Sequence, residues 1–302
     1  MQEIQKPRLL VIGSKGFIGQ HLIKNAQELW DVVPADCQAD LAEPGSFCVD
    51  ITKAESVRDL FQQARPDAAV LLAAMSDIDR CEQEPDQAWA VNVQGAGNVA
   101  DSCGETGARL LFVSSAAVFD GNQHGYKEED PPHPLSTYGR TKHQAEIVIS
   151  KMLPSAIIVR LALVLGFSHS PGTNAFLNRL EQALRPGGTV HAPADEYRNP
   201  IDVATLSKVF VELVQSPAAS GIFHLGSLDA LSRYEMTRQL AEGMGFQDSQ
   251  IIPQPSSQSG RAARGKDHLL LTDRILEICD IPLGTAHDVI RRSLDGFAQS
   301  SL

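Results

Sequence analysis

Tyr138 and Lys142 stand four positions apart, in a segment whose composition suits a helix. Residues at this spacing project from one face of a helix, so the two side chains are expected to lie close together. The phenol of a free tyrosine has a pKa of about 10, which is too high for efficient proton transfer at neutral pH. A neighbouring ammonium group favours the phenolate and lowers that pKa. The pair therefore predicts acid–base chemistry, and its more ordinary interpretation is a half-exposed pair on an amphipathic helix.

The turn at residues 113–121 contributes a serine that could act with this pair. Ser115 follows an apolar run that we expect to be a parallel strand. Side chains at the carboxyl end of such a strand face the ligand crevice of an α/β sheet. The Ser115 hydroxyl could therefore hydrogen-bond a carbonyl or hydroxyl group and stabilise charge there. The alternative is a local turn or a helix cap, which accounts for many serines after strands.

Three glycines follow the first apolar run of the chain. Gly13, Gly16 and Gly19 have the spacing GxxGxxG. In such loops the first glycine permits the tight turn, the second lets the backbone approach a diphosphate, and the third lets the helix pack against the sheet. The following helix would offer free N–H groups to the anion. Placed between a strand and an amphipathic helix, the loop predicts a dinucleotide site rather than a plain turn.

An acidic residue is expected to bind the adenosine ribose about 20 positions further on. Asp36 ends the second apolar run, 17 positions after Gly19. Its carboxylate would repel a 2′-phosphate and favours NAD, whereas Lys15 in the glycine loop could attract that phosphate and favours NADP. The sequence leaves NAD or NADP open, and a loop or capping aspartate is the alternative for Asp36. With such a cofactor bound, Lys142 could also hold ribose hydroxyls.

The scaffold expected around these residues alternates short apolar runs with longer helical stretches. Because the runs are apolar throughout, they predict a parallel sheet covered on both faces, a Rossmann-like doubly wound α/β fold. One long helix is expected after Pro85, and another from Ser136 onward. The expected strands are residues 8–12, 31–35, 68–73, 109–113, 156–161 and, later in the chain, 221–225.

The pattern loosens after Gly166 and divides the chain in two. Residues 1–166 are expected to form a dinucleotide-binding Rossmann domain. Residues 167–302 are expected to form a smaller α+β region that binds the substrate, with 201–226 returning to the first domain. Helices are expected in this part at 175–184, 203–214 and 232–243.

Composition limits the classes of function. The 302 residues include 26 Lys and Arg against 37 Asp and Glu, a net charge of −11, which argues against a general nucleic-acid groove. No apolar run is long enough to span a membrane, and no secretory signal is expected from the polar start. The five cysteines have no CxxC pair and the nine histidines have no ligand spacing, so neither a disulfide framework nor a metal site is expected. A reduced, cytoplasmic setting fits these features best.

Several motifs together resemble the extended short-chain dehydrogenase/reductase family, in particular its sugar-nucleotide reductases. The resemblance covers nearly the whole chain, and the segment PLSTYGRTK at 134–142 is the closest match. The other segments that carry it are GSKGFIG at 13–19, VDIT at 49–52, LAA at 72–74, DIDRCE at 77–82, WAVN at 89–92, VFDG at 118–121, YKEED at 126–130, RNPIDV at 198–203 and 261–271.

The resemblance implies a role for each matching residue. Tyr138 would be the general acid that protonates a carbonyl as hydride arrives, Lys142 would lower its pKa and bind ribose, and Ser115 would orient the carbonyl. The cofactor would be held by Gly13, Lys15, Gly16, Phe17, Ile18, Gly19, Asp36, Asp50, Ile51, Ala73, Ala74 and Asn92 together with Tyr138 and Lys142. The substrate would contact Met75, Ser76, Ala116, Arg198, Arg261 and Arg264, and the last two form a basic cluster with Lys266 that could hold a diphosphate.

The motifs lead to three hypotheses. The first is an NAD(P)H-dependent reductase of a 4-keto nucleotide sugar, resembling dTDP-4-dehydrorhamnose reductase. Such reductases usually have Thr-Asp-Tyr where this chain has Ser115-Ala116-Ala117, a sequence closer to the nucleotide-sugar epimerases and dehydratases, which are the second hypothesis. The third is a non-catalytic dinucleotide-binding regulatory subunit. The expected partner is a small nucleotide sugar, without nucleic acid or membrane, and assembly as a homodimer is left open.

Overall fold

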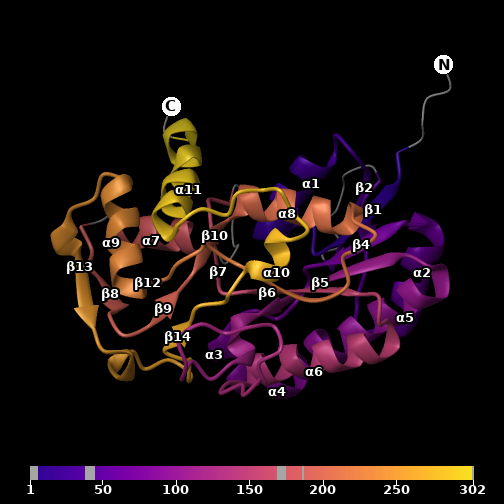
Figure 1. Ribbon diagram of the computed structural model, residues 1–302, viewed down its shortest axis with the longest axis horizontal. Coiled ribbons are helices and arrows are strands. Elements are labelled where there is room, and N and C mark those ends of the chain that lie inside the picture. Colours follow the sequence, from indigo (N-terminus) through magenta and orange to yellow (C-terminus); the bar gives the residue numbers. More distant parts are fainter. Residues whose placement is uncertain (1–5, 38–44, 169–174, 186, 301–302) are drawn as a thin grey trace.

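A computed structural model describes residues 6–37, 45–168, 175–185 and 187–300 of the chain. Its centre is a sheet of seven parallel strands in the order β11–β6–β5–β4–β1–β2–β3 (Figure 1). The chain builds outward from β1 in one direction and then returns to build from β4 in the other, as in a doubly wound fold. The fold class predicted from the sequence is confirmed. The strands are β1 Arg8–Ile12, β2 Asp31–Asp36, β3 Phe47–Cys48, β4 Ala68–Leu71, β5 Arg109–Ser115, β6 Ile157–Leu161 and β11 Gly221–Leu225.

Helices cover both faces of this sheet because its strands are apolar on both sides. Alternate residues of β1 enter separate cores: Leu9 and Val11 in one, Leu10 and Ile12 in the other. The first core includes side chains of α1 (Phe17–Ala26), α8 (Val203–Gln215) and α10 (Asp273–Leu276). The second includes side chains of α2 (Ala54–Ala64), α5 (Ala96–Thr106) and α6 (Thr137–Met152). The two sets lie above and below the sheet in Figure 1.

The helix expected after Pro85 is not α-helical throughout. A short helix α3 (Ile78–Gln83) precedes α4 (Pro85–Trp89), and a π-helical segment, η1 (Ala90–Gly95), then leads into α5. Gly95 comes close to the rest of the molecule, because a Cβ there would lie 2.7 Å from Cγ1 of Ile51. A π-helical turn inserts an extra residue and re-aims the side chains around it, and such turns are frequent at functional sites.

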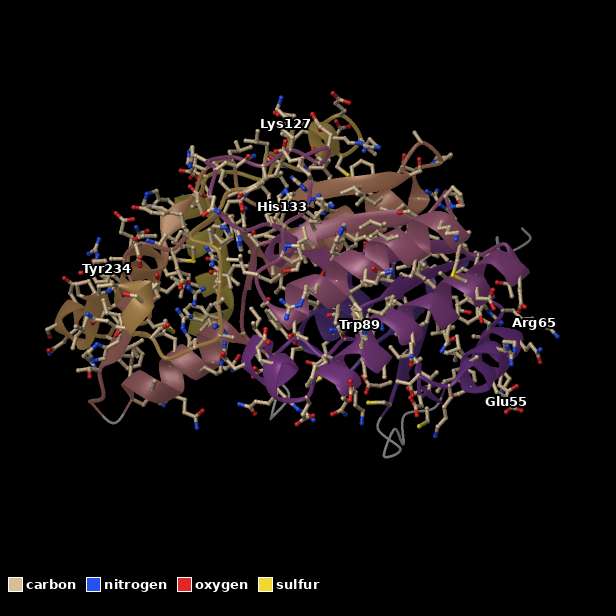
Figure 2. All side chains as sticks on the ribbon, turned by 90° about the horizontal axis from the view of Figure 1, so that it is seen from below. Glu55, Arg65, Trp89, Lys127, His133 and Tyr234 are labelled. Carbon is tan, nitrogen blue, oxygen red and sulfur yellow. The ribbon has the colours of Figure 1, made fainter. Side chains whose placement is uncertain are left out.

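The remaining elements form a smaller part at the left of Figure 1. Helices α7 (Phe176–Leu184), α9 (Arg233–Gly243) and α11 (Ala286–Ser300) flank three short sheets, and a core of its own includes residues of all three helices. Tyr234 on α9 and Arg65 after α2 lie at opposite ends of the molecule (Figure 2). The sheets pair β7 (Leu163–Leu165) with β10 (Pro200–Asp202), β8 (Val190–Pro193) with β13 (Ile251–Gln254), and β9 (Tyr197–Arg198) with both β12 (Leu231–Ser232) and β14 (Asp267–His268).

The segment after β10 returns to the large sheet, where α8 packs against α1 and β11 pairs with β6. Short 3-10 turns complete the description, at Ala116–Val118, Asp248–Gln250 and Ser256–Gln258. Among the residues that the structure describes, no helix is both long and apolar enough to cross a membrane.

Candidate functional site

A cavity of about 1520 Å³ lies at the carboxyl ends of the central strands and extends to α7 and α9. In open α/β sheets this is where ligands bind, at the point where the strand order reverses. Nearly all residues predicted from the sequence line this one cavity. They are Gly13, Lys15, Gly16, Phe17, Ile18, Gly19, Asp36, Asp50, Ile51, Ala73, Ala74, Met75, Ser76, Ser115, Tyr138, Lys142, Arg198, Arg261 and Arg264.

The glycine loop is packed so closely that side chains would not fit. Gly13 has φ 94°, and a Cβ on it would lie 2.7 Å from the backbone nitrogen of Ala73. A Cβ on Gly19 would clash with the carbonyl oxygen of Gly13. Gly16 caps α1 without a side-chain hydrogen bond. The first N–H groups of α1 are therefore offered to the cavity, as an anion-binding helix terminus requires.

Two aspartates stand beside this loop. One carboxylate oxygen of Asp36 accepts a hydrogen bond from the backbone N–H of Lys15 at 3.0 Å, so Asp36 also fixes the loop. Asp50 accepts hydrogen bonds from the N–H and hydroxyl of Thr52 and pairs with Lys53 at 3.3 Å. These contacts, the Thr52 hydroxyl foremost, lower the pKa of Asp50. Both acids line the end of the cavity nearest β2.

Ser115 and Tyr138 meet at the cavity wall. Ser115 ends β5 and its hydroxyl accepts the N–H of Ala117 at 3.1 Å, so the turn predicted as the alternative is present as well. Tyr138 lies in the first turn of α6, which Ser136 caps by accepting the N–H of Gly139. A Cβ on Gly139 would clash with the carbonyl oxygen of Ala117, so the helix can approach the turn only because Gly139 has no side chain.

Burial dominates the titration of Tyr138. It raises the pKa of the phenol to about 12, while a hydrogen bond with the Ser115 side chain opposes the rise. The sequence predicted a lowered pKa because of Lys142, and the structure differs from that expectation. Burial disfavours the phenolate by more than its polar neighbours favour it.

Lys142 is 2% exposed, and its ammonium nitrogen lies 4.1 Å from the centroid of the Phe112 ring. Burial lowers the pKa of Lys142 to about 7, and the carboxylate of Glu146 acts in the opposite direction. A lysine with this pKa changes its charge near neutral pH, which ordinary lysines do not.

A buried ion pair beneath Lys142 fixes the position of α6. Glu146 lies one helical turn beyond Lys142 and accepts two hydrogen bonds from Arg160 on β6, at 2.9 and 2.8 Å. It also accepts the Ser114 hydroxyl at 2.5 Å. These contacts, with Arg160 the first of them, outweigh burial and lower the pKa of Glu146 to about 2. Our sequence analysis missed Glu146, although its spacing of four from Lys142 could have indicated it.

Two predicted residues do not reach the cavity. Asn92 is 2% exposed, and its amide is committed to the backbone N–H and carbonyl of Met75 and to the Thr141 hydroxyl. It lies in the π-helical segment, which turns its side chain inward. Ala116 is buried in a small apolar cluster with Phe119. Both residues therefore pack behind the residues that line the cavity and do not line it themselves.

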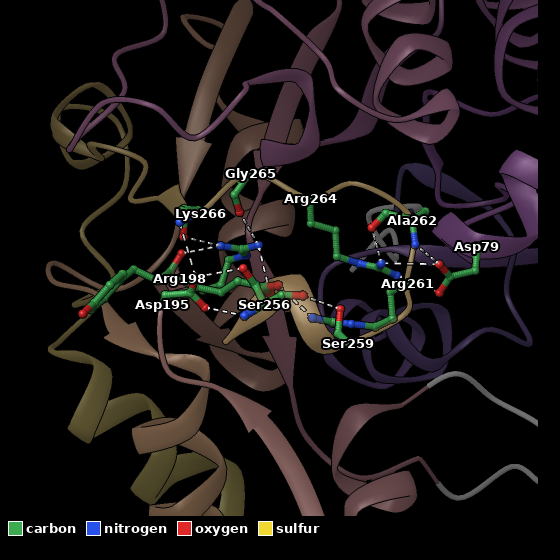
Figure 3. Close-up of polar contacts among 12 residues, drawn as sticks. Asp79, Asp195, Arg198, Ser256, Ser259, Arg261, Ala262, Arg264, Gly265 and Lys266 are labelled. Atoms are coloured by element: carbon green, nitrogen blue, oxygen red, sulfur yellow. Dashed lines mark hydrogen bonds and ion pairs between the residues drawn. The ribbon is translucent and has the colours of Figure 1, made fainter. Parts of the chain in front are cut away.

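The basic residues of the segment 261–266 are neutralised by carboxylates (Figure 3). Arg264 pairs with Asp79 at 2.9 Å and Arg261 with Glu196 at 2.7 Å. Arg198 donates to the carbonyls of Gly265 and Lys266. Five residues that line the cavity were not predicted as site residues from the sequence: Asp79, Phe176, Arg179, Glu196 and Arg233.

The chain is similar to several proteins of known sequence or structure. The family described as the RmlD substrate binding domain matches residues 7–298. The methionine adenosyltransferase 2 subunit beta of Rattus norvegicus is 28% identical over 273 residues, which are 88% of this chain and 81% of the relative. A probable low-salt glycan biosynthesis reductase of Haloferax volcanii is 30% identical over 241 residues, 78% of this chain and 79% of the relative. The structure of dTDP-4-dehydrorhamnose reductase from Bacillus anthracis in complex with NADP has a TM-score of 0.88 and 24% identity, covering 97% of this chain and all of that one.

Proposed function

Because the chain belongs to the family of the RmlD substrate binding domain, we propose that it is an NAD(P)H-dependent reductase of a 4-keto nucleotide sugar. One observation carries the proposal: the glycine loop, Ser115, Tyr138 and Lys142 all line one cavity, in which the Ser115 side chain lies close enough to Tyr138 to lower its pKa. The similarity to a dTDP-4-dehydrorhamnose reductase supports the same reading.

The glycine loop fits a dinucleotide. Its backbone can approach a diphosphate because Gly13 and Gly19 could not carry side chains, and the uncapped start of α1 supplies N–H donors. The bound cofactor would supply the hydride. Asp36 would accept a ribose hydroxyl and favour NADH, while Lys15 beside it would favour NADPH. Titration with both cofactors decides between them.

The residues of the chain itself would supply a proton and position the carbonyl that receives it. At neutral pH Tyr138 is fully protonated, because burial keeps its pKa far above 7. It therefore has a proton to donate to the carbonyl oxygen of a substrate. The Ser115 hydroxyl would orient that carbonyl and then stabilise the tyrosinate. The ammonium of Lys142 would hold ribose hydroxyls and stabilise the same negative charge.

The test follows NADH or NADPH oxidation with 4-keto sugars linked to dTDP, UDP or GDP. We expect Tyr138→Phe to lower kcat at least about 100-fold, because general acid catalysis typically contributes that much. Tyr234→Phe is the matched control, since Tyr234 does not line the cavity and lies at the far end of the molecule (Figure 2). A Tyr138→Phe variant with most of the rate would show that the acid is misassigned. Cofactor that stays bound without net oxidation would favour an epimerase or dehydratase instead.

A second candidate is a regulatory subunit that binds a dinucleotide without turning it over. The relative named methionine adenosyltransferase 2 subunit beta, which aligns with 88% of this chain, favours it. Under this hypothesis the protein would co-elute with a methionine adenosyltransferase catalytic subunit in gel filtration. It would also bind NAD(P)H but would not oxidise it when any 4-keto nucleotide sugar is added.

A further inference from the structure

The arginines that line the cavity fall into two groups. Each guanidinium of the first group has a polar partner. Arg80 pairs with Glu84, and Arg264 pairs with Asp79. Arg198 donates to backbone carbonyls and pairs with Glu196, which also pairs with Arg261. The second group is Arg179 and Arg233. Within the described residues, neither guanidinium has a hydrogen-bond acceptor or a carboxylate partner.

The position of Arg233 is fixed although its charge is unpaired. It is the first residue of α9, which Ser232 and Glu235 cap reciprocally. Its backbone N–H donates to the Glu196 carbonyl at 2.7 Å. Its guanidinium stacks 4.4 Å from the centroid of the Phe176 ring, on α7. Arg179 lies three positions further along that helix. Two helices thus direct two free cations into one end of the cavity.

The neighbouring carboxylate is already occupied. One oxygen of Glu196 accepts Arg261 at 2.7 Å, and the other lies 3.5 Å from Arg198. Arg233 therefore faces several positive charges and little available negative charge. Burial, together with Arg198, Arg261 and Arg179, lowers the pKa of Arg233 to about 9. Arg233 is half-buried and Arg179 is exposed, and no carboxylate in the described part of the chain balances either charge, so both are available to attract an anion.

We propose that Arg233 and Arg179 bind the diphosphate of the nucleotide-sugar substrate; this assignment rests on the reductase function proposed above. A guanidinium suits the task because its planar donors bind phosphate oxygens in pairs. The two residues come from α7 and α9 of the smaller part of the molecule, whereas the glycine loop and β2 belong to the large sheet and its connections (Figure 1). The cofactor and the substrate would therefore have separate diphosphate sites within one cavity.

This assignment differs from the one expected from the sequence. Arg261 and Arg264 hold the segment 261–266 in place through Glu196 and Asp79, which come from other parts of the chain (Figure 3). Their charges are balanced without a ligand. They shape the cavity wall. A bound anion is stabilised less by these paired arginines than by arginines that have no partner.

The experiment measures binding of inorganic diphosphate and of dTDP and UDP by calorimetry, with NADPH first added to saturation so that the cofactor site is filled. We expect Arg233→Met to weaken binding of all three at least tenfold and Arg179→Met to weaken it several-fold. Arg185→Met is the control, because Arg185 follows α7, pairs with Glu181 and lies outside the cavity. Thermal denaturation of each variant confirms that it is folded.

Arg233→Lys is a second variant, which tests the same residue if Arg233→Met does not fold. Lysine keeps the charge and loses the paired donors, so we expect affinity between the wild type and Arg233→Met. Wild-type affinity in the folded Arg233 variants, or a larger loss in Arg264→Met, would overturn the proposal, and so would absence of diphosphate binding by the wild type. If NADPH fails to bind, the reductase proposal fails by itself, and the diphosphate titrations without NADPH still report on the arginines.

Discussion

Replacing Asn92 with alanine tests whether this residue positions the site or contacts the cofactor. Its side chain makes three hydrogen bonds, to the N–H of Met75 at 2.8 Å, to the carbonyl of Met75 at 3.1 Å and to the Thr141 hydroxyl at 3.0 Å. Asn92→Ala leaves the buried N–H of Met75 without this partner, whereas the Met75 carbonyl keeps a hydrogen bond from the Cys81 thiol at 3.3 Å. The Thr141 hydroxyl keeps its bond to the Tyr138 carbonyl at 2.8 Å.

The expected loss follows from the orphaned N–H of Met75. A buried polar group without a partner costs about 1–3 kcal/mol, so Asn92→Ala should lower the free energy of unfolding by about that much, towards the upper end because three hydrogen bonds are lost. Asn98→Ala is the matched control, because the Asn98 amide has one bond, to the Ile51 carbonyl at 2.8 Å, and is half-buried. That variant should lose about 1 kcal/mol.

Urea denaturation followed by circular dichroism measures both losses, and NADPH titration of the folded variants measures cofactor affinity. A loss in Asn92→Ala no larger than in Asn98→Ala would refute the reasoning. Stability near that of the wild type with NADPH affinity reduced tenfold would show that Asn92 contacts the cofactor, as the sequence had predicted. Full affinity with reduced stability would support the positioning role.

Gly19→Ala should abolish tight NADPH binding in a titration, since its Cβ would clash with the Gly13 carbonyl oxygen. Gly104→Ala, on α5 with open space around it, should instead raise stability by about 0.5–1 kcal/mol in urea, and a loss there would contradict the packing argument. Burial, with Arg160 adding to it, lowers the pKa of His224 to about 3, so below about pH 6.5 the unfolded chain binds a proton that the folded one does not. Stability in urea should therefore fall as the pH drops from about 6.5 towards 3, and His224→Gln should make that fall shallower. Lys142 loses its charge as the pH rises through about 7, so NADPH affinity should decline above that pH. Glu146→Gln removes the carboxylate that raises the pKa of Lys142, so the decline in NADPH affinity should start at lower pH. An unchanged dependence of NADPH affinity on pH would exclude Lys142 as the group that titrates.

The sequence predicted the central strands well for a physical reason. A parallel strand buried on both faces must be apolar throughout, and β1 and β11 have the bounds that their apolar runs indicated. The resemblance to the extended short-chain dehydrogenase/reductase family is confirmed by the family match, and the TM-score confirms the fold. The long helix predicted after Pro85 is present as the continuous run of α4, η1 and α5, but its π-helical turn was not predicted, because a single such turn leaves the apolar spacing on either side close to that of an α-helix.

The candidate site was only partly predictable. Residues that follow strands or stand in the glycine loop could be placed, because strand ends of a parallel sheet meet at one edge. Arg179, Glu196 and Arg233 come from separate elements and have no motif, so only the fold brings them together. The pKa values of Tyr138 and Lys142 depend on burial, which spacing does not reveal.

The strand β11 lies at one edge of the large sheet and is far along the chain from the strand β6 that it pairs with. The apolar strand β6 is covered on one side by β5 and on the other by β11, which arrives only after the strands β7 to β10 have been passed. During synthesis β6 would therefore remain an open edge until residue 225 has left the ribosome. Such edges pair with other chains. A fragment ending at Gly166 should consequently aggregate, whereas one ending after β11 and α10 keeps β6 paired on both sides.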